Sequence, residues 1–139
     1  MSVILNPYIT FNGEARQAME FYQSVFGGEL NVMSFADLPD MPTGPEEKDK
    51  VMHAMLTGDN GVVVMGADTP NGQEYTPFNG SISLSGDDEA TLTGYFEKLS
   101  AGGEIGEPLT KAPWGDTFGM CKDKFGVHWM VNIAGTPAG

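Results

Sequence analysis

Two histidines are the side chains of this sequence best suited to acid–base chemistry or metal binding. In a β-strand successive side chains point to opposite faces, so His128 shares a face with Met130. His53 alternates with Ala54 and Leu56, whose apolar side chains suit packing under a helix, so we expect His53 to face the other way. Two such histidines could hold a metal ion or act as general acid and base. A metal site also needs a third ligand, which their spacing does not supply, so hydrogen-bonded histidines are the favoured interpretation and ligand contact stays open.

Sulfur-containing side chains are the second group with possible chemistry. Five methionines in predicted strands suggest either a soft-metal site or a flexible pocket, although we expect most of them in the core: Met33, Met55, Met65, Met120 and Met130. The single cysteine, Cys121, excludes an internal disulfide and a multi-cysteine metal site. Its only basic neighbour is Lys122, so a low-pKa nucleophile is not expected.

Aromatic and acidic residues near predicted turns are candidate pocket groups. Trp114 and Phe118 flank the start of a predicted strand, where they could form a pocket wall, whereas Trp129 is expected in the core. Asp68 and Asp116 could be polar anchors at a cavity rim, or they could form turns.

Composition excludes several classes of function. The formal net charge of −12, with Arg16 as the single arginine, disfavours nucleic acid and anionic membranes as partners. No apolar run is long enough to span a membrane, and residues 1–5 do not resemble a secretory signal, so we expect a cytoplasmic protein. The sequence has no dinucleotide-type glycine loop, phosphate loop or serine nucleophile elbow.

The strongest structural signal is an internal repeat. One constant offset superposes Glu14 on Glu89, and Gly27-Gly28-Glu29 on Gly102-Gly103-Glu104. A somewhat smaller offset then superposes Gly61 on Gly126 and Met65 on Met130. Each copy must bury its apolar face, so the 139 residues are expected to form one domain of two modules, about 1–75 and 76–139.

Each module is predicted to contain a strand, a helix and three further strands. Apolar residues recur at helical spacing after Glu14 and after Asp87-Asp88, and a glycine pair ends each helix. The predicted strands cover residues 3–11, 29–36, 50–57, 62–67, 81–85, 104–108, 117–122 and 127–133. Asp59-Asn60-Gly61 predicts a tight hairpin. Residues 38–49, rich in proline and acidic residues, are predicted to be a loop, which could be solvated or could cover a pocket. The fold class is therefore α+β, with paired βαβββ modules whose strands form a curved mixed sheet around a cavity.

This order of elements resembles the vicinal oxygen chelate superfamily of glyoxalases, bleomycin-resistance proteins and dioxygenases. Six stretches resemble its PhnB-like branch: residues 6–13, 18–22, 26–30, 51–54, 114–119 and 123–132, the last with Lys124 where relatives often have proline. The resemblance implies a glyoxalase-like fold and a homodimer.

The resemblance also implies where a catalytic metal would be held. Its four ligand positions fall on Pro7 or Tyr8, on Met65, on Ser81 and on Met130. None of these side chains is the carboxylate or imidazole that hard divalent ions prefer, so we expect no metal and no cofactor.

The favoured function is binding of an unknown small molecule. The expected pocket residues are Tyr8, His53, Met65, Asp68, Ser81, Trp114, Phe118, His128 and Met130. The alternative is a metal-dependent lyase or dioxygenase-like enzyme with a non-standard ligand set around His53 and His128.

Overall fold

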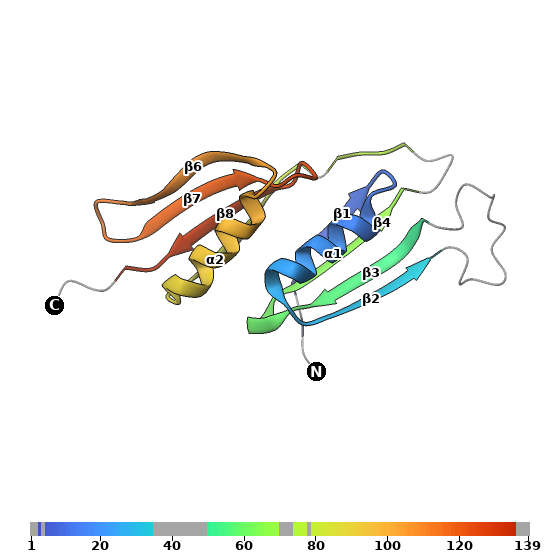
Figure 1. The fold of residues 1–139 in the computed structure, drawn as a ribbon, viewed down its shortest axis with the longest axis horizontal. Helices are drawn as coiled ribbons and strands as arrows, with labels where there is room; N and C mark the ends of the chain where they lie inside the picture. Colours follow the sequence, from blue (N-terminus) through green and yellow to red (C-terminus); the bar gives the residue numbers. More distant parts are fainter. Residues whose placement is uncertain (1–2, 4, 35–49, 70–73, 78, 136–139) are drawn as a thin grey trace. The chain divides into compact units, whose positions relative to one another are not determined.

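The computed structural model describes residues 3, 5–34, 50–69, 74–77 and 79–135. The chain divides into two compact units, residues 1–78 and 79–139, each of which is described by itself (Figure 1). The predicted loop at residues 38–49 lies outside the described residues.

Unit 1 contains one βαβββ module. Its elements are β1 (Tyr8–Phe11), α1 (Ala15–Phe26), β2 (Glu29–Ser34), β3 (Val51–Thr57) and β4 (Val63–Asp68), with a short 3₁₀ turn at Asp59–Gly61. The sheet order is β1-β4-β3-β2, in which β1 and β4 are parallel and the other pairs are antiparallel.

Unit 2 repeats this order. Its elements are β5 (Ser81–Gly86), α2 (Glu89–Ser100), β6 (Glu104–Lys111), β7 (Thr117–Lys122) and β8 (His128–Ile133). The sheet order β5-β8-β7-β6 has the same pattern of parallel and antiparallel pairs. The predicted fold class of two βαβββ modules is therefore confirmed, with the strands hydrogen-bonded as two four-stranded sheets, one in each unit.

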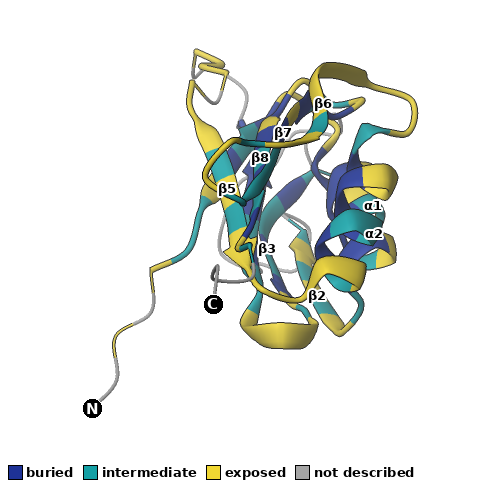
Figure 2. Ribbon diagram, turned by 90° about the vertical axis from the view of Figure 1, so that its left-hand side faces the viewer, coloured by how far each residue is buried: buried dark blue, intermediate teal, exposed yellow. Residues whose placement is uncertain are grey.

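Each helix covers one face of its own sheet. The buried residues of α1 recur at helical spacing, and Figure 2 shows the buried side of each helix in dark blue and its outer side in yellow. Under α1 lie the buried strand residues Ile9, Val64, Ala54 and Leu56. The alternate residues of these strands form the opposite face of the sheet, which we call the open face.

The first strand is shorter than predicted. It begins at Tyr8 because Pro7 has no N–H to donate, although the Pro7 carbonyl still accepts a hydrogen bond from the Met65 N–H at 3.0 Å. The predicted hairpin is confirmed: the Gly58 N–H donates to the Val62 carbonyl at 2.8 Å, and Asn60 adopts a left-handed φ of 62°.

Candidate functional site

The open face of unit 1 brings together three of the predicted pocket residues. Tyr8 on β1 is the register partner of Met65 on β4, and Met65 is the partner of Met55 on β3. His53 lies two residues before Met55 on the same face, opposite Met33 on β2. The open face therefore combines one imidazole, one phenol and three thioethers.

Tyr8 and His53 form the polar contact of this face. The Tyr8 Oη lies 3.4 Å from the His53 Nδ1, and the rings are tilted by 31° with centroids 5.8 Å apart. Since β1 and β3 both flank β4, Tyr8 reaches His53 across β4. Partial burial raises the pKa of the Tyr8 phenol, so this group stays protonated at neutral pH.

The five strand methionines are not in the core, contrary to the expectation for most of them. Met33 is 43% exposed and Met120 is 37% exposed, while Met55, Met65 and Met130 are half-buried. Among the residues that the structure describes, the fully buried methionine is instead Met19, on the inner side of α1. Side chains alternate between the two faces of a strand. The face covered by the helix supplies the buried residues, so these methionines lie on the open face.

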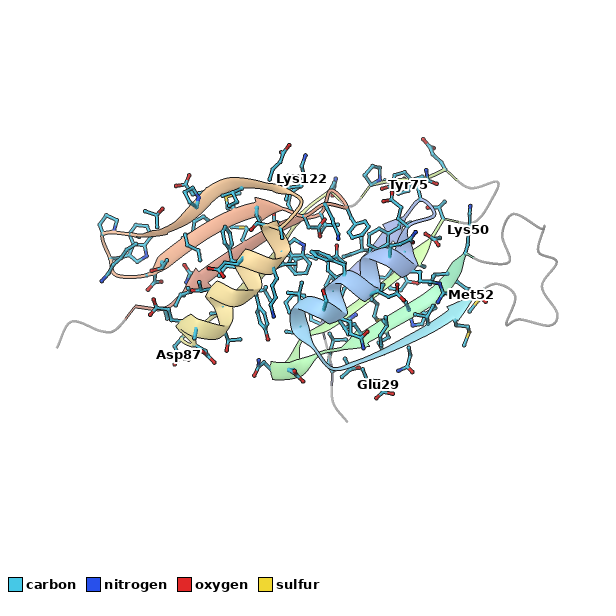
Figure 3. The ribbon with its side chains drawn as sticks, in the orientation of Figure 1. Glu29, Lys50, Met52, Tyr75, Asp87 and Lys122 are labelled. Carbon is cyan, nitrogen blue, oxygen red and sulfur yellow. The ribbon has the colours of Figure 1, made fainter. Side chains whose placement is uncertain are left out.

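The open face of unit 2 carries another four of the predicted residues. Ser81 is the register partner of His128, which in turn lies opposite Lys122, labelled in Figure 3. On the same face, Met130 lies opposite Met120, and Phe118 lies opposite Asn132. The edge strand β5 adds three hydroxyl groups to this face, those of Ser81, Ser83 and Ser85.

The register assigns a different serine to the strand position beside Met130. Met130 is the partner of Ser83, whereas Ser81, the ligand position that the resemblance implied on this strand, is the partner of His128. Ser83 follows Tyr8 by the same offset that superposes Glu14 on Glu89, so the pair Ser83–Met130 in unit 2 corresponds to the pair Tyr8–Met65 in unit 1. Neither pair supplies a carboxylate or an imidazole.

Trp114 lies in the turn between β6 and β7 and is 76% exposed. Within this turn the Ala112 N–H donates to the Asp116 carbonyl at 2.6 Å. The Asp116 carboxylate accepts from the Gly135 N–H at 2.8 Å and from the Asn132 amide at 3.3 Å. These bonds lower the pKa of Asp116, the Gly135 bond having the larger effect. The Asp116 hydrogen bonds thus stabilise the turn in which the exposed Trp114 lies.

Asp68 has a structural role. Its buried carboxylate accepts hydrogen bonds from the backbone N–H groups of Gly13 (2.8 Å), Ala15 (2.9 Å) and Val51 (2.9 Å). Ala15 is the first residue of α1, whose N-cap residue Glu14 makes no side-chain capping bond. Asp68 therefore connects the end of β4 to the starts of α1 and β3.

Asp123 has a comparable role in unit 2, which was not predicted from the sequence. Its buried carboxylate accepts from the N–H groups of Phe125 (2.8 Å) and Val127 (3.0 Å) and from the Trp129 indole at 2.9 Å. The available signal was the tight-turn sequence Asp123-Lys124-Phe125-Gly126, which favours an aspartate that bonds the following backbone.

Cys121 is buried on the helix side of β7. Burial, and to a smaller extent the charge of Asp123, raises the pKa of its thiol to about 11. A thiol is nucleophilic as the thiolate, so the raised pKa keeps Cys121 in the weakly reactive thiol form at neutral pH, in line with the prediction that its pKa is not low.

The donor sets of the open faces do not fit a hard divalent metal. Among the residues that the structure describes, no group of three or more His, Cys, Asp or Glu side chains is arranged to hold a metal ion. Tyr8, Met65, Ser83 and Met130 offer hydroxyls and thioethers, whereas hard ions prefer carboxylates and imidazoles.

In the described part of the chain, no helix is long and apolar enough to cross a membrane.

Comparison with known proteins identifies the family. The model of the Glyoxalase/Bleomycin resistance protein/Dioxygenase superfamily matches residues 4–131, so the chain belongs to this superfamily. Protein YjdN of Escherichia coli (strain K12) is 29% identical over 140 residues, which cover 93% of this chain and 94% of that protein.

Solved structures give the same result. Protein PA1353 from Pseudomonas aeruginosa is 38% identical, with a TM-score of 0.81 and coverage of 95% of this chain and 98% of that one. A protein from Bacillus cereus described as a putative 3-demethylubiquinone-9 3-methyltransferase, PhnB protein, is 27% identical with a TM-score of 0.72, covering 95% of this chain and all of that one. The resemblance to the PhnB-like branch is thereby confirmed.

Proposed function

We propose that this protein binds a small organic molecule on an open face of one of its two sheets, without a divalent metal. The observation that carries the proposal is the composition of these faces. In unit 1 the strand positions where the family's enzymes are expected to hold a metal carry Tyr8 and Met65, which are adjacent partners in the sheet.

The chemistry of the unit 1 face suits an organic ligand. Half-buried methionines are flexible and polarizable, so they adapt to apolar groups of varied shape. The Tyr8–His53 pair adds a hydrogen-bonding group beside them, which would orient the ligand. On the open face of unit 2 we propose Ser81, Phe118, His128 and Met130 as ligand contacts, and Trp114 at its exposed turn. Homodimerisation stays a prediction.

The alternative function is a metal-dependent enzyme with His53 and His128 as ligands. It would gain support if a bound divalent ion accompanied catalytic turnover. A methyltransferase activity, which the description of the Bacillus cereus relative suggests for that protein, has no support from a nucleotide-type glycine loop in this sequence.

A ligand screen with matched variants tests the proposal. A library screened by thermal shift should yield compounds that raise the melting temperature, since a ligand at 100 times its Kd stabilises by about 2.7 kcal/mol. For such a compound we expect Tyr8→Phe and His53→Leu to weaken binding by roughly 1 kcal/mol each, which corresponds to about fivefold in Kd. Tyr75→Phe is the matched control, because Tyr75 is also a partly exposed tyrosine but lies in no strand of either sheet (Figure 3).

Equal affinity of the wild type, Tyr8→Phe and His53→Leu would contradict the assignment of the unit 1 face. Variants at Trp114 and Phe118 then locate the binding compound on unit 2 instead.

A further inference from the structure

We propose that the open face of unit 1 also binds one monovalent copper ion, Cu(I), through soft donors: the thioether sulfurs of Met33, Met55 and Met65 and the imidazole of His53. This inference goes beyond the proposed function, because it concerns a soft ion rather than an organic ligand or a hard divalent metal.

The four donors come from three adjacent strands. Met33 on β2 is the register partner of His53 on β3, and Met55 on β3 is the partner of Met65 on β4. His53 and Met55 are two residues apart and so lie on the same face. Directly opposite side chains have Cβ atoms about 4.5–5.5 Å apart, and diagonal neighbours about 7–8 Å apart, within reach of long side chains. Met33 and Met65 lie on opposite sides of β3, so both side chains must extend over β3 to share one ion. The methionine side chain has three rotatable bonds, so its sulfur can move toward a shared ion.

The donor types select for soft metals. Thioether and imidazole ligands suit Cu(I), whereas carboxylate, carbonyl and water ligands suit magnesium, calcium and manganese. All four donors are neutral, so the bound ion keeps its positive charge in a protein whose formal net charge is −12. Binding changes no oxidation state and breaks no covalent bond.

Tyr8 would support His53 as a ligand. For the His53 Nε2 lone pair to bind the ion, the ring proton must be on Nδ1, from which it can be donated to the Tyr8 Oη 3.4 Å away. Ligating histidines commonly donate their other N–H to an oxygen in this manner, which fixes the ring and its tautomer. Tyr8 would therefore be a positioning residue rather than a ligand.

The internal repeat provides a comparison within the same chain. Unit 2 keeps the methionine pair, as Met120 opposite Met130, but the repeat places Phe118 where unit 1 has His53. The residue opposite Phe118 is Thr110, whereas in unit 1 the residue opposite His53 is Met33. His128, the remaining imidazole of that face, has Ser81 and Lys122 as its register partners and so has no methionine directly opposite it. The repeat thus predicts copper binding by unit 1 and weak or no binding by unit 2.

Competition with a chromophoric Cu(I) chelator, under anaerobic reducing conditions, tests the inference. We expect the wild type to withdraw one equivalent of Cu(I) from the chelator. The double variant Met55→Leu/Met65→Leu should bind at least about tenfold more weakly. The matched control is Met120→Leu/Met130→Leu, which should bind as the wild type does. Methionine and leucine have similar volumes, and thermal melts verify that both variants fold.

A second measurement does not depend on variants. Because the chain has two histidines, nitrogen NMR signals of both rings can be followed while silver(I) is added as a redox-inert substitute for Cu(I). We expect the His53 ring nitrogen signals to shift at one equivalent while those of His128 stay in place. Failure of the wild type to compete for copper, equal affinity in Met55→Leu/Met65→Leu, or a shift confined to His128 would each overturn the inference. The proposed organic ligand would be unaffected by that outcome, because its test uses a different probe.

Discussion

Replacing Asp68 by alanine is expected to lower the free energy of unfolding by at least about 3 kcal/mol. The substitution removes the acceptor of three backbone N–H groups, those of Gly13, Ala15 and Val51, and the last two bonds are buried. Each buried donor left without a partner costs about 1–3 kcal/mol. Urea denaturation of the two proteins measures the difference.

Two further variants separate this role from a general effect of losing a carboxylate. Asp68→Asn keeps the shape but replaces one acceptor oxygen by a donor, so its loss should be large as well. Asp88→Ala removes the exposed N-cap of α2, whose side chain accepts from the Thr91 N–H at 3.2 Å, and should cost less. If Asp68→Ala were no more destabilising than Asp88→Ala, Asp68 would be free to act as the ligand anchor that the sequence suggested.

Replacing Asp123 by alanine is expected to destabilise the protein by about 2 kcal/mol or more. The Trp129 indole and the Val127 N–H lose a buried acceptor, and the turn before β8 loses its bond from Phe125. The same change should lower the pKa of the Cys121 thiol, since the charge of Asp123 contributes to raising it. Denaturant titration measures the first effect.

Thiol alkylation of the folded protein measures the second effect. At a given mildly alkaline pH, the Cys121 of Asp123→Ala should be alkylated faster than that of the wild type, because more of it is thiolate. The Lys124→Ala variant, which changes the same turn without removing the carboxylate, is the control. Unchanged stability together with an unchanged alkylation rate would contradict the role assigned to Asp123.

The fold could be predicted from the sequence because the repeat and the strand periodicity act together. Glycine pairs end both helices at Gly27 and Gly102, and the turn at Asp59–Gly61 fixes the hairpin between β3 and β4. These are local signals, and the repeat doubles them. The start of β1 could not be predicted from local signals. It depends on which hydrogen bonds β1 makes with β4 near Pro7, and β4 is the last strand of the same module.

The site could be predicted only in part. Side-chain alternation along the strands correctly placed His53 and His128 on the open faces. Residue type alone suggested that the strand methionines are buried, and only the strand register shows that Met33 and Met55 lie beside His53. Asp68 illustrates the difficulty, since its partner Gly13 is far away in the sequence. In contrast, Ser83 could have been identified from the repeat offset that relates it to Tyr8.

Elemental analysis of the purified protein tests the central claim most directly, namely that the chain binds its ligand without a divalent metal. The protein should be prepared without added metal or chelator, and its melting temperature recorded before and after chelator treatment. The positions occupied by Tyr8, Met65, Ser83 and Met130 predict far less than one equivalent of nickel, zinc, manganese or iron per chain, and no change in melting temperature. Near one equivalent of any of these ions, with a melting temperature that falls on chelation, would contradict the account and favour the metal-dependent enzyme.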